Sequence, residues 1–102
     1  MTPENERRRW PRRRVEAKAE FRRKREMRYS IPVHDLTAQG CRIGSPERLI
    51  RGETVWLQLP SLESLPATVR WTGLGVSGVE FDQPMHTAVY EMMTGRLAPI
   101  AP

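Results

Sequence analysis

Short segments in which apolar and polar residues alternate fill the second half of this chain, and they limit its fold more than any other feature. Such alternation is typical of a strand with one face buried. Turn-forming residues separate the segments, which span residues 41–43, 54–59, 65–71 and 76–81. Several short strands with turns between them predict a β-sandwich or a β-barrel, and a barrel leaves no strand edge exposed.

Details of these segments bear on individual side chains. The alternation of 65–71 ends at Trp71, which we expect to be structural, as is Trp56 in the preceding segment. The alternation of 76–81 slips by one residue near Gly78. An isolated glycine inside a strand pattern indicates a β-bulge, so we expect a bulge at Gly78.

A short helix is expected near the C-terminus. Asp82 is a suitable N-cap, Pro84 suits a first helical turn, and Gly95 stands where a helix would stop. The apolar residues between them have helical spacing and form one stripe, which we interpret as a cover for the core. The stripe consists of Met85, Val89, Met92 and Met93.

Residues 15–28 fit a helix and a strand about equally well. Apolar residues alternate from Val15 to Phe21, but the alanine, glutamate and lysine content also favours a helix. Residues 29–33 are more strand-like, with Pro32 expected at an edge or bulge. The residues alone leave the conformation of 15–28 open.

Charge is concentrated at the N-terminus of this 102-residue chain, which is long enough for one domain. Residues 1–28 hold 12 of the 17 Lys and Arg and 5 of the 12 acids, so their net charge is +7 and that of the remainder is −2. A basic segment favours an anionic partner such as a phosphate-bearing ligand or nucleic acid.

Several classes of protein are excluded. The single cysteine, Cys41, cannot form an internal disulfide, and no apolar run of 18 residues or secretory signal is present. We therefore expect a cytoplasmic protein without membrane insertion. One cysteine and two separated histidines give no metal-ligand spacing, and no nucleophile–base set is evident. Catalytic residues, a metal and a cofactor are not expected.

The basic segment contains the run Arg7-Arg8-Arg9-Trp10-Pro11-Arg12-Arg13-Arg14. Pro11 prevents a regular helix interior here, so the arginines are displayed on an extended segment. Guanidinium groups make paired hydrogen bonds to phosphate and stack on purine bases, and a dinucleotide offers both. Alone, the run is more typical of a solvated basic arm or of a nucleic-acid contact.

A second pattern is the stretch Asp35-Leu36-Thr37-Ala38-Gln39-Gly40. On an extended chain Asp35 and Thr37 point the same way and offer a carboxylate and a hydroxyl to one ligand edge. A carboxylate can accept two hydrogen bonds from guanine, and Gly40 permits a close backbone approach. An ordinary turn between strands explains the same stretch equally well.

Taken together, the two patterns resemble the PilZ domain family. That family has an RxxxR motif in an N-terminal loop and, about twenty residues later, a D/N-x-S-x-x-G motif on the barrel. Arg8 to Arg12 match the first motif, and Asp35 to Gly40 match the second, with Thr37 where serine is usual. The ends of the barrel pattern, 69–71 and 78–82, are also similar, so the resemblance covers residues 6–94.

The resemblance implies an all-β fold: a six-stranded antiparallel β-barrel with a flexible basic N-terminal loop and a short C-terminal α-helix. Residues 15–28 would then contain a strand. The expected domains are the Arg-rich segment 1–14, the barrel and helix 15–95, and a short tail, 96–102.

The resemblance also implies a non-catalytic bacterial receptor for cyclic di-GMP, which acts on an unidentified downstream protein. Asp35, Thr37 and Gly40 would bind the guanine, while Arg8 and Arg12 would bind phosphate and stack on the base. A second register, Arg9 and Arg13, is also open. Arg7 precedes the motif, which favours an intercalated pair of ligand molecules, and Trp10 could stack on a guanine or pack on the barrel.

Two other functions compete with this interpretation. A small basic β-barrel could bind nucleic acid along its N-terminal arm, although the net charge of −2 outside that arm makes a broad basic face improbable. A PilZ-like module could also bind proteins only and ignore nucleotides. A titration with cyclic di-GMP and with oligonucleotides separates the three.

Overall fold

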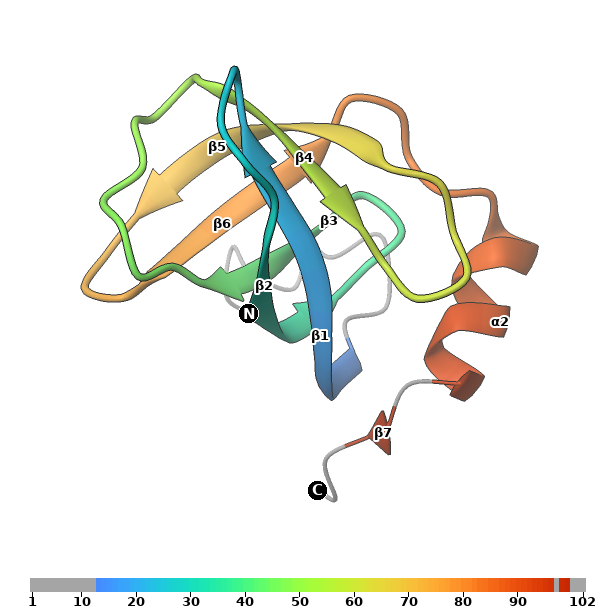
Figure 1. Ribbon diagram of the computed structural model, residues 1–102. Coiled ribbons are helices and arrows are strands. Elements are labelled where there is room, and N and C mark those ends of the chain that lie inside the picture. Colours follow the sequence, from blue (N-terminus) through green and yellow to red (C-terminus); the bar gives the residue numbers. More distant parts are fainter. Residues whose placement is uncertain (1–12, 97, 100–102) are drawn as a thin grey trace, which may run out of the picture.

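The computed structural model describes residues 13–96, 98 and 99, and it shows a β-barrel with a helix beside it (Figure 1). The strands lie close to the segments predicted from alternation. In chain order the elements are β1 (Arg13–Arg23), β2 (Tyr29–Leu36), β3 (Gly40–Gly44), β4 (Thr54–Gln58), β5 (Leu65–Thr72), β6 (Val76–Phe81), α2 (Thr87–Arg96) and β7 (Ala98–Pro99).

Strand pairing closes the barrel. The order of neighbours is β2-β3-β6-β5-β4-β1, and β1 also pairs with β2. All these pairings are antiparallel. Within the described residues this is the six-stranded antiparallel barrel that the sequence predicted. The two residues of β7 pair with Val15 and Glu16 of β1.

The open question over residues 15–28 is resolved in favour of a strand for its first half. β1 runs to Arg23 and pairs with β2 on one side and β4 on the other. Ala19 and Phe21 are buried, and Phe21 meets Tyr29 edge-on at 5.5 Å between ring centroids. Pairing with two strands outweighs the local helix propensity, which is a weak preference.

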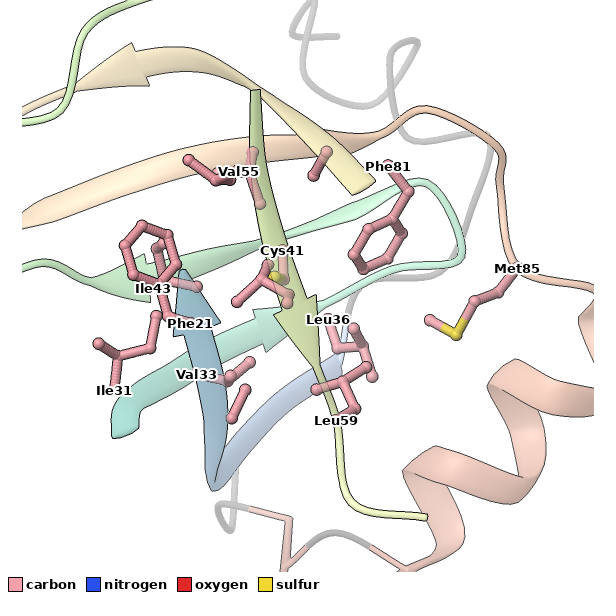
Figure 2. Packing of buried hydrophobic residues seen from close by; sticks show 14 of the residues in the cluster. Phe21, Ile31, Val33, Leu36, Cys41, Ile43, Val55, Leu59, Phe81 and Met85 are labelled. Carbon is pink, nitrogen blue, oxygen red and sulfur yellow. The ribbon is translucent and has the colours of Figure 1, made fainter. Parts of the chain in front are cut away.

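The inward-facing side chains of the alternating strands fill the barrel and form its core. Val55 and Leu57 of β4 and Ala67 and Val69 of β5 are all fully buried, and Val55 pairs directly with Ala67. Figure 2 shows buried side chains of this core, among them Val55 of β4 and Cys41 of β3. Burial, and secondly the nearby charge of Asp35, raises the pKa of the Cys41 thiol to about 12, so this cysteine is an inert core residue.

The helix begins later than predicted. Asp82 and Pro84 precede α2, and the N-cap is His86, whose Nδ1 accepts a hydrogen bond from the backbone N–H of Ala88 at 3.1 Å. Asp82 instead accepts a bond from the Thr68 hydroxyl. The predicted cap was wrong because another residue supplies the acceptor that the first turn needs.

The apolar stripe does cover the core, but with a different membership. Met93 and Tyr90 are buried against it, and Val89 packs on its edge. Met92, which we placed in the stripe, is 41% exposed. Tyr90 also donates a hydrogen bond from its hydroxyl to the carbonyl of Leu36 at 3.3 Å, which ties α2 to the end of β2.

An ion-pair network holds the β3–β4 loop against the β1–β2 hairpin. Arg23 donates to both carboxylate oxygens of Glu53 and to Glu47, each at 2.9 Å. The hydroxyl of Tyr29 donates to Glu47 at 2.7 Å. The Tyr29 bond, followed by the Arg23 bond, lowers the pKa of Glu47 below its ordinary value of 4.5.

This network predicts a pH-dependent contribution to stability. Because the pKa of Glu47 is lower in the folded state, its stabilisation is complete above about pH 4.5 and is lost as the pH falls. Tyr29→Phe removes the bond but keeps the ring contact with Phe21. We expect the melting temperature to fall less between pH 6 and pH 3 in this variant than in the wild type. Equal falls in a thermal melt series would contradict the assignment.

Candidate functional site

A β-bulge in β2 turns Asp35 toward the outer face of the barrel. Val33 pairs with Ile43 of β3, and Asp35 pairs with Arg42, so β2 has one extra residue, His34, between the two pairs. Because side chains alternate along a strand, an extra residue reverses the faces beyond it. Without the bulge, Asp35 would follow Val33 into the core.

A second bulge does the same for Trp71 in β5. Val69 pairs with Val79 of β6, whereas Trp71 pairs with Gly78, which leaves Arg70 as the extra residue. Trp71 therefore lies on the outer face and is 46% exposed. The alternation of 65–71 had suggested that Trp71 is structural like the residues before it. Because of the bulge, its side chain does not point into the core with theirs.

The bulge expected at Gly78 was assigned to the wrong strand. β6 alternates regularly, because Ser77, Val79 and Phe81 are all buried, with Ser77 only 2% exposed. Gly78 faces outward beneath the indole of Trp71. A Cβ at Gly78 would lie 2.1 Å from Nε1 of that ring, so only glycine lets the indole settle there.

The two bulges place polar and aromatic groups in one row across the barrel. Cross-strand pairing sets Arg14, Asp35, Arg42, Gly78 and Trp71 side by side on β1, β2, β3, β6 and β5. An open pocket of about 440 Å³ follows this row from β2 to β5. Its lining residues are Asp35, Thr37, Gln39, Gly40, Cys41, Arg42, Arg70, Trp71, Gly78, Val79 and Glu80.

Asp35 is the buried charge of this pocket. Its side chain is 7% exposed, and its Oδ2 lies 2.9 Å from Nε of Arg42, whose side chain is 41% exposed. Oδ1 has no hydrogen-bond partner within the described part of the chain. A buried carboxylate oxygen without a donor is unusual in a folded protein and marks a position for a ligand or solvent donor.

Thr37 and Gly40 form the turn between β2 and β3. The Thr37 hydroxyl accepts bonds from the backbone N–H groups of Gln39 and Gly40, both at 3.1 Å. It also donates to the carbonyl of Gly40 at 3.2 Å. The structure therefore brings Asp35, Thr37 and Gly40 to the same pocket, with the Thr37 hydroxyl engaged in the turn.

The arginine run joins the barrel beside Asp35. Arg14 is the direct β1 partner of Asp35, and Arg13 is the partner of Leu36. The remaining predicted ligand-binding positions, Arg7, Arg8, Arg9, Trp10 and Arg12, lie outside the described residues. The attachment point is thus on the same side of the molecule as Asp35 and Thr37, which a shared site requires.

Of the residues that line this pocket, the sequence patterns predicted Asp35, Thr37 and Gly40 as site residues. The charged and aromatic lining residues that they missed are Arg42, Arg70, Trp71 and Glu80. Arg70 and Glu80 form an ion pair, with Arg70 Nε 2.6 Å from Glu80 Oε1. Arg70, Trp71 and Glu80 are distant in sequence from the 35–40 motif, whereas Arg42 lies two residues after it. The outward positions of β3 and β6 could have been noted from the strand period, but their alignment depends on strand order and register.

Neither a metal site nor a membrane-spanning helix is present in the described part of the molecule. There, no three His, Cys, Asp or Glu side chains are grouped to hold an ion. The one helix described there, α2, is not long and apolar enough to cross a bilayer.

These observations define the class of protein: a small closed barrel with a polar pocket on its outer face and a basic segment attached beside that pocket. Residues 6–94 match the family model of the PilZ domain, and the chain belongs to the PilZ domain family. PilZ domains are generally non-catalytic receptors for cyclic di-GMP. A comparison with curated proteins gave no match.

Proposed function

We propose that this chain is a non-catalytic receptor that binds cyclic di-GMP in the outer pocket and closes its N-terminal segment over the ligand. The main support is the row from Arg14 through Asp35 to Trp71, because it joins the basic segment to an acceptor and an aromatic ring. In this proposal Arg8 and Arg12 bind the phosphates and stack on guanine. Asp35, Thr37 and Gly40 form the base-binding side.

The chemistry of the ligand suits these groups. Guanine carries two neighbouring donors, N1–H and the N2 amino group, which a carboxylate can accept, and Asp35 has an unpartnered oxygen. A flat base can stack on an exposed indole such as that of Trp71. Guanidinium groups pair with phosphate oxygens in a bidentate manner, which supplies affinity at the other end of the ligand.

Relay of the signal follows from charge neutralisation. Residues 1–28 carry a net charge of +7, and the repulsion between these positive charges opposes their gathering at one site. Ligand phosphates remove that repulsion and favour the closed state, in which a new surface faces a downstream protein. Arg7, directly before the motif, favours an intercalated pair of ligand molecules over a single one.

Isothermal titration of the full chain tests the proposal. We expect saturable heat with cyclic di-GMP, none with GMP at the same concentration, and a stoichiometry of two ligands per chain. A double-stranded oligonucleotide is the control for the nucleic-acid alternative, because its binding would fall steeply with salt and survive loss of Asp35. Folded protein that gives no heat with cyclic di-GMP at low salt would refute the receptor assignment.

A further inference from the structure

Asp35 and Arg42 are held close together without satisfying each other. Arg42 Nε lies 2.9 Å from Asp35 Oδ2, but its N–H does not point along a hydrogen bond. Nε of Arg42 and Oδ1 of Asp35 are both buried and have no hydrogen-bond partner in the described residues. Two adjacent buried polar atoms without partners indicate that the pair is completed by something else.

The pair is directed at the pocket. Asp35 and Arg42 are direct cross-strand partners on β2 and β3, and both line the cavity. The Arg42 side chain is 41% exposed although its Nε is buried, so other atoms of this side chain are accessible. The pocket therefore presents an acceptor and a donor group side by side.

Guanine carries the complementary order of groups along its edge. Its N2 amino group and N1–H are donors, and the next two groups, O6 and N7, are acceptors that arginine binds in a bidentate manner. Adenine has an acceptor at N1 and a donor at N6. Its N1 would therefore face the carboxylate, which is also an acceptor, and its N6 amino group would face the guanidinium, which is also a donor. A carboxylate beside a guanidinium thus selects guanine over adenine.

We propose that Asp35 and Arg42 read one guanine together and that Arg42 sets the preference for guanine over adenine. This inference rests on the proposed binding of cyclic di-GMP and adds a specificity residue to it. Asp35 accepts from N1–H and N2, and Arg42 donates to O6 and N7. The two groups form an ion pair with each other, in which Arg42 Nε lies 2.9 Å from Asp35 Oδ2.

Arg70 provides a matched comparison in the same pocket. It is also an exposed arginine, on β5, which is separated from β3 by β6, but Glu80 already accepts a hydrogen bond from its Nε at 2.6 Å. Loss of either arginine changes the net charge equally. A difference between the Arg42 and Arg70 variants therefore reports base contacts and not general attraction of phosphate.

The experiment is a titration of wild type, Arg42→Ala, Arg42→Lys and Arg70→Ala with cyclic di-GMP and cyclic di-AMP. We expect Arg42→Ala to weaken cyclic di-GMP binding by about 10- to 100-fold and to leave cyclic di-AMP binding unchanged. Arg42→Lys keeps the positive charge beside Asp35 but lacks the planar fork, so it should lose most of the same preference. Arg70→Ala removes a positive charge from the same pocket, so it should weaken the binding of both nucleotides by a similar factor and leave the ratio of their affinities unchanged.

Three results would overturn the inference, and they are distinguishable from one another. If both Arg42 variants kept the wild-type ratio of the two affinities, Arg42 would not read the base. If Arg70→Ala lowered the preference for cyclic di-GMP over cyclic di-AMP as much as Arg42→Ala, the effect would be one of charge alone. If wild type bound neither nucleotide, the proposed function would fail first. Thermal melts check that each variant is folded. If Arg42→Ala does not fold, Arg42→Lys is used for the comparison instead.

Discussion

Replacement of Gly40 by alanine is expected to lower the free energy of unfolding by about 3 kcal/mol. A Cβ at position 40 would lie 2.1 Å from the carbonyl oxygen of Val79 and 3.0 Å from Cα of Glu80. Both neighbours are backbone atoms of β6, so no side chain can rotate away. The paired strands β3 and β6 must separate, and the floor of the pocket would separate with them.

The measurement is a denaturant or thermal melt beside a matched glycine variant. A loss of 3 kcal/mol in a domain of this size corresponds to a fall of roughly 12–24 °C in melting temperature. Gly95 in α2 has no atom within 4 Å of an added Cβ, so Gly95→Ala should be neutral or slightly stabilising. Equal melting temperatures for the two variants would show that β6 can move aside at little cost.

Gly40 illustrates which part of the site a local pattern predicts and which part depends on the fold. The 35–40 pattern suggested that glycine permits a close approach of backbone to a ligand. The structure shows a close approach to another strand, because Gly40 pairs with Glu80. The identity of that partner depends on strand order, which a local pattern does not contain.

The strands themselves were predictable because each buries one face. The predicted segment 54–59 corresponds to β4, Thr54–Gln58, and the predicted segment 76–81 is β6. Alternation is a local property that directly reflects burial. The conformation of 15–28 was not decided locally, because β1 is stabilised by its pairing with β2 and β4.

The pocket was only half predictable, for the same reason. Asp35 was identified by its motif, but Arg42 and Trp71 join it only through cross-strand register. Each of the two bulges adds one residue, and nothing in the alternation of 65–71 marks Arg70 as that residue. A bulge is favoured by the closure of the whole barrel, so its position follows from tertiary structure.

Alanine at Arg8 or Arg12 is expected to reduce cyclic di-GMP binding by about 100-fold, and the double variant should abolish measurable binding. The pairing of Arg14 with β2 limits how far position 12 can lie from the pocket. Arg14 is the β1 partner of Asp35, and chain length keeps the Cα of Arg12 within about 7 Å of that of Arg14. A guanidinium at position 12 can therefore reach a phosphate in the pocket, and charge-assisted pairs to phosphate are among the strongest single contacts.

The matched controls are Arg9→Ala and Arg13→Ala, which remove the same charge one position along the run. If binding depended only on the total charge of the segment, all four single variants would weaken it equally and added salt would erase the differences. We expect the Arg8 and Arg12 variants to lose at least about 10-fold more than their neighbours at physiological salt. A larger loss of affinity at Arg9 and Arg13 would show that the second register is used, in which Arg9 and Arg13 contact the phosphates.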